Sequence, residues 1–438
     1  MQMRKYKLGD IATVEISGVD KKVKDGEENI HLCNFVDVYY NWAITMARHD
    51  SFMLATARPN EISKFQLRKG QVALTKDSET RDDIGISTYI ADDFDDVILG
   101  YHCALITPNK DILDGRYLNA LMHTDYAKKY FACNASGSGQ RYALSAETLN
   151  SFPVPVIPLQ KQKQIGEIFS ALDKKIELNK QINQNLEEMA KRLYDYWFVQ
   201  FDFPNKDGKP YKSSGGEMVW NEKLKREIPK EWCSHEIKDF MRIFTGKKDV
   251  SKAIPGKYKF FSCAPEPITS NEYIYDGAAV LVSGNGSYTG RVSFYKGKFD
   301  LYQRTYACVL DAETENIPFF FYTLRYLFQP AYSGGKHGSS IPYIVLSDLA
   351  NFKFAYNKLY LEQFITTIKP LFDQQSINME ELESLTKQRD ELLPLLMNGQ
   401  VSVNSDLSVC INLIIRTTTR ICRYPNDLFW SYLRIVFL

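Results

Sequence analysis

The residues of this chain that could do covalent chemistry do not form a catalytic set. Gly334–Ser340 contains glycine, lysine and serine, as phosphate-binding loops do, but it lacks the Gly-x4-Gly-Lys-Ser/Thr spacing of such a loop. Glu236–Lys238 resembles the end of a nuclease motif, and a salt-bridged strand edge explains it equally well. No Asn/Asp-Pro-Pro-Tyr/Phe motif of an amino-methyltransferase occurs, and the six histidines suggest no Ser/His/Asp set. The sequence therefore indicates a binding protein rather than an enzyme.

The bulk composition excludes several other classes of protein. None of the eight cysteines forms a Cys-x-x-Cys pair, so we expect reduced structural thiols and no metal site. The net charge of +1 argues mildly against a protein that binds nucleic acid alone through bulk electrostatics, although a local basic face or a partner could supply the charge. No apolar run reaches the length of about 18 residues that a membrane helix needs, and no signal-peptide core is visible. We therefore expect a cytoplasmic protein without membrane contact.

The chain repeats one plan twice. A Gly/Ser-rich loop runs into a Leu-Ser pair in Ser136–Ser145 and again in Gly335–Ser347. An extended exit follows each loop, at Phe152–Pro158 and at Phe352–Ala355, and each exit leads into a long segment with helical periodicity. Two similar modules on one chain suit a target that also comes in two parts.

The composition divides the chain into six segments. Two strand-rich modules each precede a helix that is rich in Gln, Lys, Glu and Leu, and turn-forming residues separate the first helix from the second module. The segments are 1–158 for the first module, 159–200 for the central helix, 201–230 for a linker with turns, 231–357 for the second module, 358–403 for the C-terminal helix and 404–438 for an atypical tail.

Both helices carry a heptad-like apolar seam that predicts a helical partner. In the central helix the seam residues are Phe169, Leu172, Ile176, Asn179, Asn183, Leu186 and Leu193. In the C-terminal helix they are Ile368, Leu371, Gln375, Asn378, Leu382, Leu385 and Leu392. The polar seam residues favour an antiparallel pair with a fixed register, and the alternative is two unrelated helices that serve their own domains or a homodimer. Pro370 and Pro394 should kink or bound the second helix.

Two segments carry a resemblance to a known family. Ala171–Ala190, which runs on to Trp197–Asp202, resembles the central spacer helix of type I restriction–modification specificity subunits. Leu385–Val401 is similar to the C-terminal spacer helix of the same family. The resemblance covers about residues 1–403. Within the two modules, the general plan is similar more than the individual residues are.

The resemblance implies an α+β fold with two pseudo-repeated, strand-rich target-recognition domains and two long antiparallel coiled-coil spacer helices. Each domain would read one half of a bipartite target on double-stranded DNA, and the helices would set the gap between the halves. The implied partners are two methyltransferase subunits, which dock on the helices, and the restriction (motor-nuclease) subunits. The chain itself would be no enzyme and would bind no cofactor, since S-adenosylmethionine, ATP and Mg²⁺ are expected on the partners.

Reading DNA needs side chains that reach base edges and others that bind phosphates. The candidates in the first module are Lys76, Ser78, Thr80, Arg81, Ser136, Ser138, Gln140, Arg141 and Tyr142. Arg141 has the guanidinium that can bind guanine with two hydrogen bonds, and Gln140 has the amide that suits adenine. As an alternative, each Gly/Ser-rich loop is an ordinary turn without DNA contact.

The second module has parallel loops with different residues. Its candidates are Asn285, Ser287, Tyr288, Arg291, Gln303, Arg304, Lys336, His337, Ser339 and Ser340. Lys76 and Ser283 fall at comparable points after a strand, which suggests a common role for the loops that follow. Arg291 and Arg304 could instead be surface residues of strands. Because the loops differ between the modules, we predict two different half-sites and an asymmetric target.

Two questions stay open at this point. The tail 404–438 does not fit the family pattern, and we expect an extension without a function of its own, although it could pack on the helices or bind a partner. A coiled-coil scaffold protein without sequence-selective DNA binding would keep the same helices, so it remains the alternative to a specificity subunit.

Overall fold

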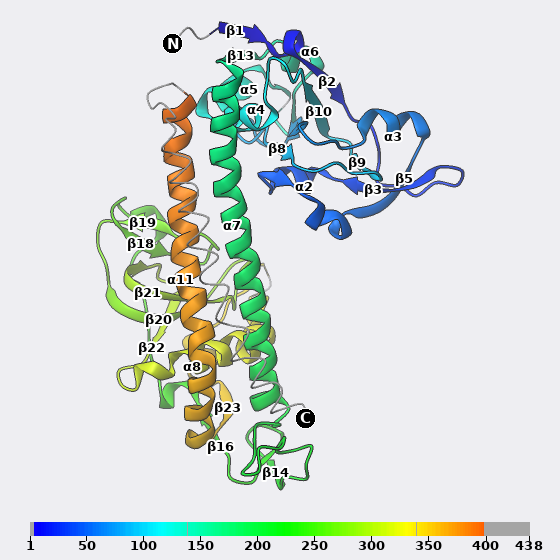
Figure 1. Ribbon diagram of the computed structural model, residues 1–438. Coiled ribbons are helices and arrows are strands. Elements are labelled where there is room, and N and C mark those ends of the chain that lie inside the picture. Colours follow the sequence, from blue (N-terminus) through cyan, green and yellow to red (C-terminus); the bar gives the residue numbers. More distant parts are fainter. Residues whose placement is uncertain (1–3, 138, 339, 398–438) are drawn as a thin grey trace. The chain divides into compact units, whose positions relative to one another are not determined.

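The computed structural model describes residues 4–137, 139–338 and 340–397, so the candidates Ser138 and Ser339 and the tail 404–438 lie outside the described residues (Figure 1). The chain divides into two compact units: unit 1 runs to Lys180 and resumes at Glu380, and unit 2 comprises Gln181–Met379. The long helices α7 (Leu159–Tyr194) and α11 (Lys358–Met397) each contribute to both units.

A five-stranded sheet forms the centre of unit 1. Its order is β2 (Ala12–Ile16), β10 (Cys103–Pro108), β6 (Val72–Thr75), β8 (Ser87–Ile90) and β4 (Ala43–Ile44), antiparallel except where β4 lies beside β8. Strand β6 is buried along its whole length. Val72 and Leu74 belong to one apolar core with Phe169 of α7, whereas Ala73 belongs to a second core with Leu32. Alternate side chains of a strand point to opposite faces, so this sheet separates two cores.

Three smaller sheets and seven short helical segments complete unit 1. The sheets are β5 (Met53–Ala57) with β3 (Glu28–Cys33) and β9 (Val97–Leu99), β11 (Ser136–Gly137) with β12 (Tyr142–Ala143) and β7 (Asp77–Ser78), and β1 (Arg4–Lys7) with β13 (Pro153–Val156). The helices are α1 (Leu8–Ile11), α2 (Phe35–Tyr39), η1 (Met46–Ser51), α3 (Pro59–Phe65), α4 (Gly115–Met122), α5 (Asp125–Asn134) and α6 (Ala146–Asn150).

Unit 2 is built around a six-stranded sheet. Its order is β17 (Arg242–Thr245), β22 (Thr305–Val309), β20 (Tyr275–Ser283), β21 (Val292–Leu301), β18 (Tyr258–Phe261) and β19 (Ile268–Ser270), with β18 parallel to β21. Two separate antiparallel pairs are β14 (Met218–Asn221) with β15 (Arg226–Pro229), and β16 (Cys233–Glu236) with β23 (Lys353–Tyr356). The helical segments are η2 (Asp195–Val199), η3 (Ile237–Asp239), η4 (Val250–Lys252), η5 (Thr314–Asn316), α8 (Ile317–Thr323), η6 (Leu324–Phe328), α9 (Gln329–Tyr332) and α10 (Leu346–Ala350).

The segment 201–230 is more than the linker with turns that its prolines and glycines suggested. Phe201 and Phe203 are fully buried, and both belong to the core of unit 2. Phe201 has a left-handed backbone with φ of 62°, and the guanidinium of Arg226 lies 4.6 Å from its ring centre. The segment therefore packs against the core instead of remaining a solvated linker, because burial of these aromatic rings is favourable.

The two long helices pair antiparallel within each unit. In unit 1, Asn179 donates to the Glu381 carboxylate at 2.7 Å, and Leu172 shares a core with Leu385. In unit 2, Asn378 donates to the side-chain carbonyl of Asn183 at 3.0 Å. Farther along α7 in the same unit, Tyr194 meets Phe364, with ring centres 6.1 Å apart. Partner numbers fall in α11 as they rise in α7, so the α+β fold with antiparallel spacer helices is confirmed.

The seam residues lie on the buried sides of the helices. Phe169, Leu172, Ile176, Asn179, Leu186, Ile368, Asn378 and Leu385 are buried, and Asn183, Leu193, Leu371, Gln375, Leu382 and Leu392 are half-buried. Of the two effects expected of Pro370 and Pro394, a helix boundary is wrong, because α11 continues through both residues to Met397. Both rings are exposed, so packing of the opposite face maintains the helix despite the missing backbone donors.

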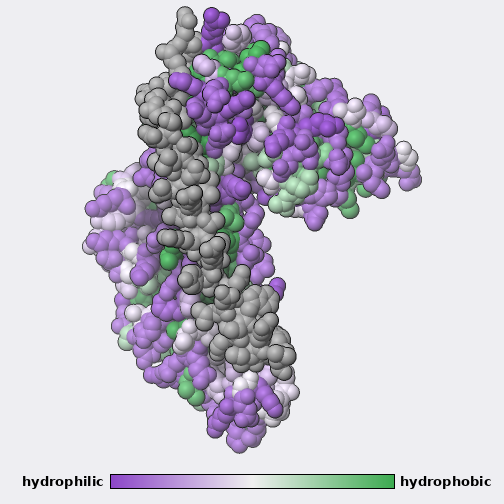
Figure 2. Space-filling view, viewed as in Figure 1, coloured by the Kyte–Doolittle hydropathy of each residue, from purple (hydrophilic) through white to green (hydrophobic). Residues whose placement is uncertain are grey.

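Two general expectations can be compared with the described residues. The cysteines among them are free, and burial raises the pKa of Cys103 and of Cys308 well above the usual thiol value. Among the helices in the described ranges, none combines the length and the hydropathy that crossing a membrane would require. Figure 2 shows that the visible surface is mostly hydrophilic, with small apolar areas between polar ones.

Candidate nucleic-acid interface

A small sheet in unit 1 brings two predicted loops together. Strand β12 pairs with β7 through Tyr142 and Ser78, and it pairs with β11 through Tyr142 and Gly137. A Cβ atom at Gly137 would lie 2.2 Å from the carbonyl oxygen of Arg141, so the hairpin requires glycine there. The candidates in Lys76–Arg81, together with Ser136 and Gln140–Tyr142, therefore form one surface, which we call the first reading surface.

Arg141 is held at the first reading surface by two residues of other segments. Its Nη2 atom lies 2.8 Å from Nδ1 and 3.0 Å from Nε2 of His102. Because Nδ1 of His102 also hydrogen-bonds to the Asp77 carboxylate and must donate there, Nε2 is the ring atom that can accept from Arg141. The Arg141 side chain remains 60% exposed, so most of its donors can still reach a ligand.

Asp77 is the buried anchor of this arrangement. Burial favours the protonated carboxyl, but the hydrogen bonds from His102 and Lys76 outweigh it, so the pKa of Asp77 lies below its usual value. The Lys76 ammonium lies 3.0 Å from the same carboxylate, and the Arg141 guanidinium lies 3.7 Å from it. His102 adopts a left-handed backbone with φ of 68°, which is uncommon for a residue other than glycine. One buried carboxylate thus orients three basic side chains.

The other candidates of the first module lie around this group. The guanidinium of Arg81 sits 5.1 Å from the ring centre of Tyr142. The hydroxyl of Ser136 donates to the carbonyl of Ala143 at 3.2 Å, so its proton is already used within the hairpin. Thr80, Arg81 and Gln140 are exposed, and Lys76, Ser78 and Tyr142 are half-buried.

In unit 2, Tyr343 joins the corresponding loops. It bridges to Asn285 on one side and to His337 on the other, and the Gly286 amide donates to Pro342 at 3.0 Å. Ser287, Tyr288, Lys336, His337 and Ser340 are exposed there, as are Gln303 and Arg304, and Asn285 is half-buried. These residues form the second reading surface.

Arg291, His337 and Lys336 each have a side-chain contact within the protein. Arg291 donates from Nη2 to the Ala264 carbonyl at 2.7 Å, and burial lowers the pKa of its guanidinium. His337 lies 3.1 Å from the Asp348 carboxylate, and the Lys336 ammonium lies 4.0 Å from the ring centre of Tyr332. Arg291 is therefore directed toward the protein backbone, whereas Lys336 and His337 stay exposed beside their partners.

Matching hydrogen bonds define equivalent positions in the two modules. The Lys76 amide donates to the His102 carbonyl at 2.9 Å, and the Gly284 amide donates to the Arg304 carbonyl at 2.9 Å. The carbonyls of Lys76 and Gly284 accept from Leu144 and Ile344. Lys76 is thus equivalent to Gly284, and His102 to Arg304.

The predicted correspondence of Lys76 with Ser283 is therefore wrong by one residue. The strand register agrees with this correction, because Thr75 lies opposite Cys103 and Ser283 lies opposite Thr305. The one-residue difference arises in the first module, because β6 ends at Thr75, one residue before Lys76, whereas β20 ends at Ser283 as expected.

Sequence reasoning did not identify His102, Asp77 and Tyr343 as site residues. Asp77 lies between the predicted residues Lys76 and Ser78, but nothing in its neighbours showed that it would be buried. His102 reaches the site through the pairing of β10 with β6, which a local pattern cannot reveal. Tyr343 had a local signal, because it follows directly on a Gly/Ser-rich loop and a proline.

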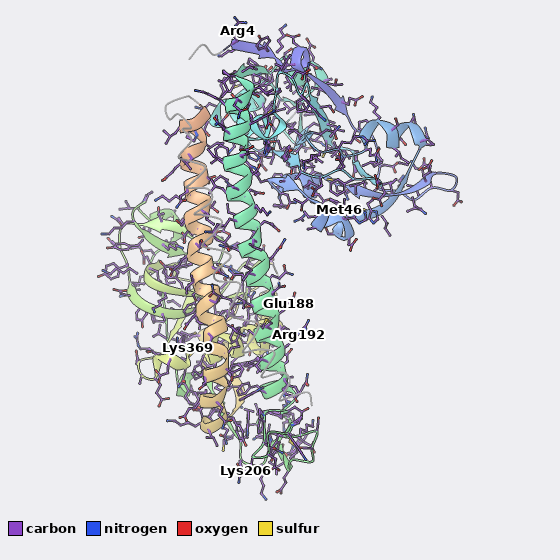
Figure 3. All side chains as sticks on the ribbon, in the orientation of Figure 1. Arg4, Met46, Glu188, Arg192, Lys206 and Lys369 are labelled. Atoms are coloured by element: carbon purple, nitrogen blue, oxygen red, sulfur yellow. The ribbon has the colours of Figure 1, made fainter. Side chains whose placement is uncertain are left out.

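The outer sides of the long helices are charged. Figure 3 shows Glu188 and Arg192 projecting from α7, and their side chains form an ion pair one turn apart at 4.0 Å. Lys369 projects from α11, where it pairs with Asp373. Each long helix is therefore amphipathic, with an apolar seam along one side and a hydrated, charged face along the other.

Comparison with known proteins agrees with these features. A family model, the type I restriction modification DNA specificity domain, matches residues 2–188 and 229–387. The type I restriction enzyme MjaIX specificity subunit of Methanocaldococcus jannaschii is 24% identical over 320 residues, which cover 67% of this chain and 71% of that protein. The EcoDI specificity subunit of Escherichia coli is 29% identical over 182 residues, 40% of each chain.

A solved structure has the same fold. The crystal structure of the type I restriction–modification S subunit from M. genitalium aligns with a TM-score of 0.58 at 15% identity, and the alignment covers 90% of this chain and 96% of that chain. The family model matches most of both modules and part of each long helix. The chain therefore belongs to the family of type I restriction–modification DNA specificity proteins.

Proposed function

We propose that the two reading surfaces bind the two halves of one split DNA target. The observation that supports this most directly is the equivalence of the loops: the same backbone hydrogen bonds hold His102 and Arg304, and Lys76 and Gly284, yet the side chains differ. A common scaffold with different side chains would place unlike donors at equivalent points of two DNA segments. The target would then be asymmetric.

In the first half-site, Arg141 is the residue proposed to read a base. A guanidinium has five donors in one plane, so Arg141 can keep its bond to His102 and still present a pair of donors to guanine. Gln140 beside it has the amide that suits adenine, and Lys76, Arg81 and the hydroxyl side chains of Ser78 and Thr80 would bind phosphates.

In the second half-site, Arg304 takes the place of His102. Its side chain is exposed next to the loops that Tyr343 joins, so it is proposed to read a base there. Asn285, Ser287, Tyr288 and Ser340 would contribute hydrogen bonds, and Lys336 and His337 would bind the backbone of the DNA. Arg291 and Gln303 are proposed to support these loops, since Arg291 donates to Ala264 and Gln303 lies 3.5 Å from Asp249.

The long helices are proposed to set the gap and to bind partners. Two methyltransferase subunits would dock on them, and restriction subunits would complete the complex in the cytoplasm. We infer that the chain is not itself an enzyme, and that S-adenosylmethionine, ATP and Mg²⁺ bind to the partners. The charged outer faces of α7 and α11 would be the docking surfaces, because the apolar seam is used between the helices.

The test is co-expression with a cognate methyltransferase subunit, followed by long-read mapping of methylated adenines. The expected result is one bipartite motif with two different halves and a constant gap. Methylation without any sequence preference would support the alternative, a coiled-coil scaffold without selective DNA binding, which the comparisons do not favour.

A further inference from the structure

Three side chains from separate segments of unit 1 converge away from the reading surface. His31 lies in β3, His49 in the turn η1 and Asp96 directly before β9. Nδ1 of His31 lies 2.8 Å from Oδ2 of Asp96, and Nε2 of His49 lies 2.9 Å from Oδ1 of the same carboxylate. The two imidazole rings are 4.4 Å apart. One ligand atom of each residue lies within 4.8 Å of the others, so one ion could contact all three.

The backbone holds these side chains in place. The His31 amide donates to the Asp96 carbonyl at 2.9 Å, and His31 pairs with Val97 where β3 and β9 run parallel. The Phe52 amide donates to the His49 carbonyl, and the Phe52 ring is buried in the adjacent core. A site formed before the ion arrives loses little entropy when it binds one.

The types of ligand select the class of ion. Two imidazole nitrogens and one carboxylate suit zinc and similar divalent transition metals, whereas Mg²⁺ and Ca²⁺ prefer oxygen ligands throughout. The second nitrogen of His49, Nδ1, lies 3.0 Å from the Asp50 carboxylate. A carboxylate behind a ligand histidine fixes the ring and increases its basicity, which is the usual second contact of a zinc-bound histidine.

From this geometry we infer that His31 Nδ1, His49 Nε2 and the Asp96 carboxylate bind one zinc-class divalent ion, with water in the remaining coordination position. Zinc–nitrogen bonds are about 2.0–2.1 Å long, so small rotations of the side chains would open the present hydrogen-bonded arrangement enough to admit the ion.

Protons compete with the ion at this site. Hydrogen bonds from both ring nitrogens of His49 to carboxylates raise its pKa, with Asp50 the larger cause and Asp96 the smaller. The Nε2 proton would pass to solvent, and the lone pair left on Nε2 would then bind the ion. Binding is therefore tested at pH 8, where fewer protons compete for the ring nitrogens.

The bound ion would have a structural effect on the first module. It would tie η1, which begins at Met46, to the sheet of β3 and β9 (Figure 3). Strand β9 (Val97–Leu99) has Asp96 on one side and leads to His102 of the reading surface on the other. The proposed site is thus separate from the reading surface, and strand β9 connects Asp96 of the site with His102.

The test uses the full-length chain without an affinity tag, treated with chelator and then titrated with ZnCl2 at pH 8 by calorimetry. Exposed Cys133 and Cys233 are alkylated first, because thiols also bind zinc. The expected result is one site that His31→Ala, His49→Ala and Asp96→Asn each abolish. The Co²⁺-loaded chain should show visible absorption that the same variants lose.

Two further variants separate ligation from folding. Asp50→Asn should weaken zinc binding about 10-fold without removing the site, since it acts through His49. The matched control is His235→Ala, which removes the histidine of an isolated His–Asp pair in unit 2, with 3.5 Å between His235 and Asp239, and should leave binding unchanged. Equal zinc binding by the wild-type chain and the three ligand variants, or none by the wild type, would overturn the inference.

Discussion

The side-chain amide of Asn378 donates to the side-chain carbonyl of Asn183 at 3.0 Å, in the seam between α7 and α11 in unit 2. Gln375 lies one turn away, and its amide lies 3.2 Å from the Glu187 carboxylate. A polar pair in an apolar seam costs stability, but it is satisfied in one register alone. The helices therefore have a fixed register in this unit, as a ruler between two DNA contacts would need.

Removing one or both members of this pair should change the stability of the protein in opposite ways. We expect Asn378→Leu to lower the free energy of unfolding by about 1–3 kcal/mol, because the side-chain carbonyl of half-buried Asn183 loses its donor. The double variant Asn183→Leu/Asn378→Leu should regain that loss, since both polar groups are then replaced by apolar ones. Urea unfolding measures both, with exposed Asn185→Leu as the control. A double variant less stable than the single one would contradict the role of the pair.

Asp173 should make unit 1 less stable as the pH rises. Burial is the main cause that raises the pKa of this carboxyl to about 7, from 3.8, and Arg389 counteracts it only partly. The folded chain therefore keeps a proton that the unfolded chain loses, so stability falls as the pH rises from about 4 to about 7. Asp173→Asn should remove this slope and stabilise unit 1 by about 2–4 kcal/mol at pH 8, at about 1.4 kcal/mol per pKa unit.

Thermal unfolding at pH 5 and pH 8 measures the effect of Asp173→Asn. The control is Asp207→Asn, which changes a carboxyl in an exposed turn of unit 2. An equal gain for Asp173→Asn at both pH values would mean that the carboxylate is not destabilised by burial.

The elements that follow from local periodicity could be predicted from the sequence. The seam of α7 repeats over many turns, so its buried face and its polar positions were readable from spacing alone. The paired loops were found because Gly/Ser-rich composition marks turns. The segment with Phe201 and Phe203 was misread, because its glycines and prolines indicate turns while its aromatic residues pack in the core.

The centre of the first reading surface could not be predicted in the same way. Asp77, His102 and Arg141 come from three segments that meet through the pairing of β10 with β6 and of β12 with β7. Strand order depends on contacts between distant segments, and no repeat in the chain encodes it. The proximity of His31, His49 and Asp96 could not be predicted for the same reason, since local spacing does not show which distant residues meet.

Arg141→Ala should relax recognition in one half-site. A base contact with two hydrogen bonds contributes about 1–3 kcal/mol of discrimination, and Arg141 lies on the first reading surface. Methylation mapping with the co-expressed methyltransferase should show altered bases in one half and an unchanged second half. Arg304→Ala is the matched variant, and it should change the other half. Uniform weakening across both halves would mean that Arg141 contacts phosphate and reads no base.

His102 should act through Arg141 rather than through the DNA. Its Nε2 accepts from the guanidinium and its Nδ1 donates to Asp77, so His102→Ala would free Arg141 without removing its charge. We expect His102→Ala to relax the same base position as Arg141→Ala, by a smaller factor. The double variant His102→Ala/Arg141→Ala should match Arg141→Ala alone, because a positioning residue has no effect once the residue it positions is gone. His102→Gln, which can still accept from Arg141, should recover part of the selectivity. Additive losses in the double variant would instead place His102 in direct contact with DNA.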